Sequence, residues 1–117
     1  MDSRVELELD RVAQLQVVMG ATVPEILTGM LSSMSTAIDH VGEAMQAGEL
    51  DRVAKAAHAC RNDAMMIGAK QLLVALTDLE NAARGGEPAS AAKALVTVNE
   101  AWLPTRDELE RASATSS

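Results

Sequence analysis

Two histidines and one cysteine are the side chains of this chain that could act as nucleophiles or metal ligands. His40 lies between Asp39 and Val41, and its position in a helix places it away from the apolar residues of its segment, so it is expected to be a solvated surface histidine. His58 points about 120° away from the apolar stripe of its own segment, since successive helical residues are about 100° apart. His58 is therefore expected to be exposed in the middle of a helix.

The surroundings of His58 suit a phosphoryl acceptor. The residues that share its side of the helix are Ala54, Lys55, Arg61, Asn62 and Met65. A histidine that accepts a phosphoryl group must be neutral, because the protonated ring has no free lone pair, and nearby cations favour the neutral ring. Lys55 and Arg61 would also stabilise the charge of the transferred group. These residues are therefore candidate phosphoryl- or partner-binding residues, with His58 as the phosphoacceptor.

A metal site is not indicated. His58 and Cys60 are two positions apart, so they point to different sides of one helix, and only one more histidine is available. Cys60 falls on the apolar stripe, which predicts a buried and unreactive thiol. A single cysteine cannot form a disulfide within the chain, so the sequence does not require an oxidising compartment.

The composition favours one helical domain and argues against several functions. The chain has 117 residues, of which 48% are apolar, with no Phe or Tyr and a single Trp. The formal net charge of -7 argues against nucleic-acid binding and against a cationic membrane-surface helix. No signal peptide or membrane-spanning segment is visible in the sequence, so a cytoplasmic location is expected.

The apolar spacing is helical nearly everywhere and predicts a bundle. An N-terminal helix is expected within residues 1–21, and the bundle is expected over residues 22–112. Its helices are predicted to begin near Pro24, Leu50, Gly68 and Pro88, and glycines mark their ends. Pro104 is expected to kink or interrupt the last helix, and residues 113–117 are expected to fray. The pattern predicts an all-α antiparallel up-down four-helix bundle with an additional N-terminal helix across one end.

The run that follows His58 resembles the signature of histidine-containing phosphotransfer (HPt) domains. In that family the phosphorylated histidine is followed by an apolar residue two positions on, a lysine three on and a glycine four on. A small residue follows at six, and a hydrophobe-Gly-Ala triplet at nine to eleven. The residues that fit are His58, Cys60, Arg61, Ala64, Ile67, Gly68 and Ala69. Residues 47–51 resemble the turn into the histidine helix, residues 72–80 resemble the next helix, and the resemblance spans about residues 24–111.

The resemblance implies a phosphorelay. A domain of this family shuttles a phosphoryl group on its histidine, here His58, to and from aspartates of response-regulator receiver domains, or between a histidine kinase and a receiver. The receiver supplies a magnesium ion and most of the catalytic machinery, so no cofactor of the chain's own is implied. No glycine-rich phosphate loop for ATP is present. The chain is thus expected to be a phosphocarrier and not an independent enzyme.

Two positions depart from the family pattern and support a second hypothesis. Asn62 stands where the family usually has glycine, one turn from His58 on the same face. Asp63 stands where serine is common, and a carboxylate close to a phosphohistidine is repelled by it. The second hypothesis is a pseudo-HPt module, which docks receiver or kinase domains without carrying phosphate. A third is a purely structural helical bundle.

Overall fold

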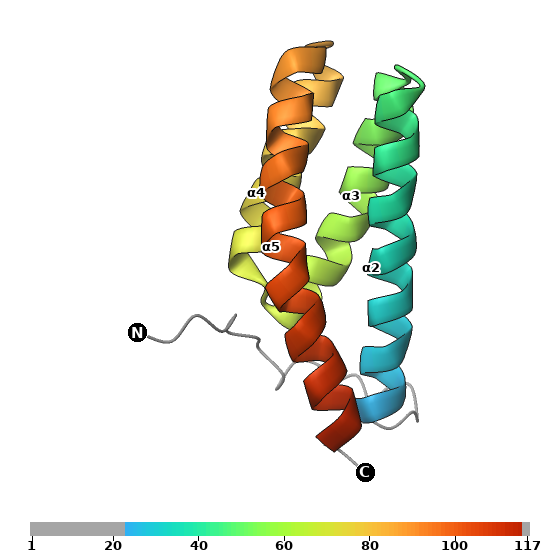
Figure 1. The fold of residues 1–117 in the computed structure, drawn as a ribbon, viewed down its shortest axis with the longest axis vertical. Coiled ribbons are helices and arrows are strands. Elements are labelled where there is room, and N and C mark those ends of the chain that lie inside the picture. The colour runs from blue at the N-terminus through green and yellow to red at the C-terminus, as the bar shows by residue number, and fades with distance from the viewer. Residues whose placement is uncertain (1–22, 116–117) are drawn as a thin grey trace.

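The computed structural model describes residues 23–115, which form four α-helices: α2 (Val23–Gln46), α3 (Leu50–Ile67), α4 (Lys70–Arg84) and α5 (Pro88–Thr115). Successive helices run up and down alternately, and the described residues include no β-strand (Figure 1). The predicted all-α four-helix bundle is therefore confirmed. The N-terminal helix predicted within residues 1–21 lies outside the described residues.

The four helices enclose one apolar core. Helix α3 packs against α2 and α4, and α5 packs against α4 and α2, so the bundle closes on itself. The large side chains that are fully buried include Leu27, Met34, Val41, Val53, Ile67, Leu72, Leu76, Leu79, Val98 and Leu109. They come from all four helices, and burial of this apolar surface is the main force that holds the bundle together. None of the described helices is long and apolar enough to cross a membrane.

Glycines with positive φ follow α2 and α3. Gly48 follows α2 with φ 72°, and Gly68 follows α3 with φ 74°. Residues with a side chain rarely adopt this left-handed conformation, whereas glycine does so at little cost. After α3, the amide of Gly68 donates to the carbonyl of Met65 and the amide of Ala69 donates to that of Ala64, which satisfies the last carbonyls of the helix. The resulting short turn brings α4 back alongside α3.

Of the two outcomes predicted for Pro104, a kink or an interruption of the last helix, the interruption does not occur. Helix α5 continues through Pro104 to Thr115, beyond the predicted bundle limit at residue 112. The residues on either side of the proline are held by the core, since Trp102, Thr105 and Leu109 are all buried. A proline inside a helix costs about 3 kcal/mol or more, and packing on both of its sides offsets this cost. The hydroxyl of Thr105 also donates to the carbonyl of Ala101.

Candidate functional site

His58 lies in the middle of α3 with its side chain in solvent. The side chain is 55% exposed, which confirms the prediction made from its helical position. The buried side of α3 consists of Val53, Ala54, Ala57, Cys60, Ala64 and Ile67, and its backbone is regular from Leu50 to Ile67. The imidazole is thus presented on the surface by a rigid element and not by a loop.

A buried carboxylate lies against His58. Glu80 of α4 is only 4% exposed, and its Oε2 lies 3.0 Å from Nδ1 of His58. An ionised carboxylate only accepts hydrogen bonds, so Nδ1 of the neutral ring must carry the proton and donate it to Glu80. The other ring nitrogen, Nε2, then keeps its lone pair. The contact therefore selects the tautomer in which Nε2 is the nucleophile.

Two arginines bind the same carboxylate. Arg61 Nη1 donates to Oε1 of Glu80 at 2.6 Å, and Arg84 Nη2 lies 2.7 Å from Oε2. Burial raises the pKa of Glu80, but the hydrogen bonds from Arg61 and Arg84, together with the electrostatic influence of His58 and Arg84, outweigh it and lower the pKa to about 2. Glu80 is therefore ionised at neutral pH and is held as an acceptor for His58.

The other predicted site residues divide between surface and interior. Lys55, Asn62 and Met65 are exposed, as expected for residues that meet a phosphoryl group or a partner. Ala54 is only 4% exposed and does not form part of this surface. Ala54 is one of the buried residues of α3, and its methyl group is too short to project beyond its neighbours.

Arg61 and Asp63 have partners within the chain that the sequence did not reveal. Arg61 was predicted to bind the phosphoryl group or the partner; in the structure its guanidinium binds Glu80 and is only partly exposed. Asp63 accepts a hydrogen bond from the hydroxyl of Ser33 on α2, at 3.1 Å. Burial raises the pKa of Asp63, and the hydrogen bond from Ser33 partly offsets this. Asp63 therefore faces α2, whereas Glu80 meets His58 from α4.

Cys60 lies in the core and is not part of the site. It is fully buried, and desolvation, with a smaller contribution from Asp63, raises its pKa to about 12. This agrees with the predicted unreactive thiol. Within residues 23–115, no three His, Cys, Asp or Glu side chains come close enough together to hold a metal ion.

Sequence reasoning missed Glu80 and Arg84. Glu80 is placed among the apolar residues of α4, next to Leu79 and one turn from Leu76 and Ala83, all of which are buried. A glutamate at such a position must have partners in the folded protein, because an unpaired buried charge is costly. A glutamate within the apolar stripe of α4 was therefore the feature of the sequence that could have identified Glu80. Arg84, four residues after Glu80, is placed by helix geometry to provide one of those partners.

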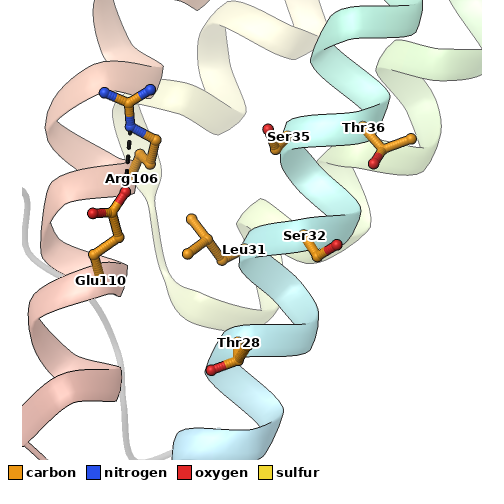
Figure 2. A pocket seen from close by; sticks show the side chains of 7 residues that line it. All are labelled: Thr28, Leu31, Ser32, Ser35, Thr36, Arg106 and Glu110. Carbon is orange, nitrogen blue, oxygen red and sulfur yellow. Dashed lines mark ion pairs between the residues drawn. The ribbon is translucent and has the colours of Figure 1, made fainter.

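A hollow of about 350 Å³ lies on the other side of the bundle. It is lined by Thr28, Leu31, Ser32, Ser35 and Thr36 of α2 and by Arg106 and Glu110 of α5 (Figure 2). The carboxylate of Glu110 lies 3.6 Å from the guanidinium of Arg106. His58 and Glu80 belong to α3 and α4, so the hollow and the histidine are on different faces.

A four-helix bundle that presents a histidine in mid-helix is the fold of HPt domains, and solved structures bear this out. Histidine-containing phosphotransfer protein B from Pseudomonas aeruginosa PAO1 superposes with a TM-score of 0.82 and 23% sequence identity, over 93% of this chain and 95% of that chain. A rice protein described as a histidine-containing phosphotransfer protein gives a TM-score of 0.77 and 15% identity, over 96% and 81% of the two chains. No family model and no curated protein sequence matches this chain.

Proposed function

We propose that this chain is a phosphocarrier of a two-component phosphorelay, which accepts and donates a phosphoryl group on Nε2 of His58. The observation that carries the proposal is the contact between His58 and Glu80, because it leaves an oriented nucleophilic nitrogen on the surface. The HPt fold supports the same function.

The reaction follows from the arrangement. The lone pair of Nε2 attacks the phosphorus of an aspartyl phosphate on a receiver domain, and the P–O bond breaks with its electron pair leaving on the aspartate carboxylate. The ring then carries a positive charge, with the Nδ1 proton still directed at Glu80. The buried carboxylate stabilises this charge as it develops. The imidazole of His58, with its Nδ1 proton held by Glu80, is a good leaving group from phosphorus. The same contact therefore also favours transfer to the next aspartate.

The partners in this proposal are a receiver domain and, upstream, a histidine kinase or a second receiver. The receiver would supply the magnesium ion, as the resemblance to HPt domains implies. Lys55, Asn62 and Met65, which are exposed around His58, would contact the partner. The chain supplies the nucleophile and the docking surface.

The alternative is a module that docks the same partners without carrying phosphate. It rests on Asn62, an exposed side chain one turn from His58, where close approach of a receiver is needed. The two functions make opposite predictions for phosphate transfer.

The deciding experiment is transfer from a phosphorylated receiver. The chain is mixed with receiver domains phosphorylated by acetyl phosphate, and acid-labile, alkali-stable phosphate on the chain is measured. We expect labelling of the wild type and of His40→Gln, and none of His58→Gln. The His58 variant should keep its stability within about 0.5 kcal/mol, as is usual for an exposed position. An unlabelled wild type that still binds a receiver would establish the docking module instead.

A further inference from the structure

A second hollow, of about 310 Å³, lies between α2 and α3 and is lined largely by basic side chains. Its lining residues are His40 of α2 and Arg52, Lys55 and Ala56 of α3. The chain as a whole carries a formal charge of -7. Cations gathered around one concave surface of an acidic protein make that surface attractive to anions in particular.

The polar groups of this hollow have free donors. Among the described residues, the side chains of His40 and Lys55 have no ion-pair or hydrogen-bond partner. Arg52 uses Nη1 to bind Glu49, at 2.8 Å. A guanidinium has five N–H donors, so Arg52 can bind a second carboxylate oxygen through the others.

The hollow borders the face that carries His58. Lys55 precedes His58 by three residues, so the two side chains are neighbours on α3, about 4.5 Å apart along the helix axis. Glu80, Arg61 and Arg84 lie on the α4 side of His58, whereas the hollow lies on the α2 side. A partner that covers His58 with even a small interface, about 600 Å² on each protein, would reach Lys55 and the hollow beside it.

We propose that the hollow formed by His40, Arg52 and Lys55 anchors an acidic side chain of the receiver domain that docks over His58. The inference rests on the proposed function, and it extends the docking surface toward α2. The lining side chains of His40, Arg52 and Lys55 are exposed, so water competes strongly with a free anion there. A carboxylate carried by a partner that is already held at His58 is present at a high effective concentration and overcomes this competition.

The test compares charge reversals at matched positions. The receiver used is the one that exchanges phosphate with His58 fastest or, if none does, the one that binds the chain most tightly. Its affinity, without phosphate, is measured by titration calorimetry. Arg52→Glu and Lys55→Glu should each raise Kd about tenfold, through the loss of an attractive charge and the gain of a repulsive one. Lys93→Glu is the control, because it reverses one exposed lysine on α5, which is not adjacent to α3.

Glu49→Gln provides a test of the opposite sign. The change removes the carboxylate that competes for Arg52, and Glu49 makes no side-chain cap hydrogen bond to α3, so the helix should persist. The receiver should bind this variant more tightly than the wild type. At saturating receiver, the transfer rate of Arg52→Glu should match the wild type, because the change affects docking and not the reaction at His58.

Three results would overturn the inference. One is an equal rise in Kd for Arg52→Glu and Lys93→Glu, which would mean that only net charge matters. Another is that inorganic phosphate at millimolar concentration shifts the NMR resonances of the His40 ring and competes with the receiver for the hollow. The ligand of the hollow would then be a small oxyanion. The third is the lack of any receiver that binds. A different pair of results would separate the two proposals. If Arg52→Glu binds the receiver more weakly but wild-type His58 never carries phosphate, the anchor is supported and the phosphocarrier function is refuted.

Discussion

Nδ1 of His58 and Oε2 of Glu80 lie 3.0 Å apart, so that a carboxylate in the interior of the bundle accepts a hydrogen bond from a ring on its surface. The two residues are 22 positions apart in the chain and belong to α3 and α4. Because Arg61 and Arg84 keep Glu80 ionised, the contact both orients the ring and directs its lone pair outward.

Replacing Glu80 by glutamine should slow phosphoryl transfer. The amide keeps the size of the side chain and an oxygen that can accept from Nδ1, but it removes the charge that stabilises the developing imidazolium. We expect the single-turnover rate at saturating receiver to fall about tenfold, which corresponds to ~1.4 kcal/mol. Glu100→Gln, at an exposed position on α5, is the matched control. Equal rates for the two variants would show that Glu80 has only a structural role.

The contribution of Glu80 to stability should depend on pH. Its pKa in the folded protein is lowered from 4.5 to about 2, so the ionised form is favoured by folding. The stabilisation is fully present above pH 4.5 and is lost as the pH falls toward 2. The difference in unfolding free energy between wild type and Glu80→Gln should therefore shrink over this range. Urea unfolding at a series of pH values measures it, and a constant difference would contradict the assignment.

The two arginines that bind Glu80 should contribute unequally to stability. The side chain of Arg61 is 28% exposed and that of Arg84 is 58% exposed, so solvent screens the second ion pair more strongly. Arg61→Ala should lower the free energy of unfolding by about 1–3 kcal/mol, and Arg84→Ala by less than about 1 kcal/mol. Thermal and urea unfolding of the two variants would show the order, and a larger loss for Arg84→Ala would reverse it.

Asn62→Gly should speed phosphoryl transfer. Residues four apart on a helix are neighbours, so the exposed Asn62 stands beside His58 in the space that a receiver needs. Glycine in place of asparagine within a helix lowers the free energy of unfolding by roughly a few tenths of a kcal/mol, so the fold should persist. Single-turnover rates at saturating receiver decide the matter. A slower glycine variant with an intact fold would mean that the Asn62 amide contributes a hydrogen bond to the phosphoryl group.

Cys60 should not react with thiol reagents in the folded protein. Burial raises its pKa to about 12, so the thiolate is scarce at pH 8, and the sulfur is inaccessible. An aromatic disulfide reagent should label Cys60 only after unfolding. Ala59→Cys in a Cys60→Ala background places the thiol on the neighbouring exposed position and should react at once. Rapid labelling of native Cys60 would contradict the buried placement.

The sequence predicted correctly those features that depend on spacing along one helix. The bounds of α3 and the exposure of His58 follow from local periodicity and from the glycines at its ends, because a residue's angular position on a helix depends only on its neighbours in the chain. The burial of Cys60 follows in the same way. The interruption predicted as one outcome at Pro104 does not occur, because the cost of a proline is local, whereas the packing that offsets it comes from other helices.

What the sequence alone determined is thus the set of four helices and the residue that each presents outward or inward, His58 above all. The tertiary structure decided which side chains meet. Glu80 is 22 residues from His58, and no periodicity within α3 or α4 states how the two helices are rotated against each other. That rotation is set by the packing of the whole core. It brings Glu80 to His58, Arg61 to Glu80 and Ser33 to Asp63, and so determines the tautomer and charge of the site.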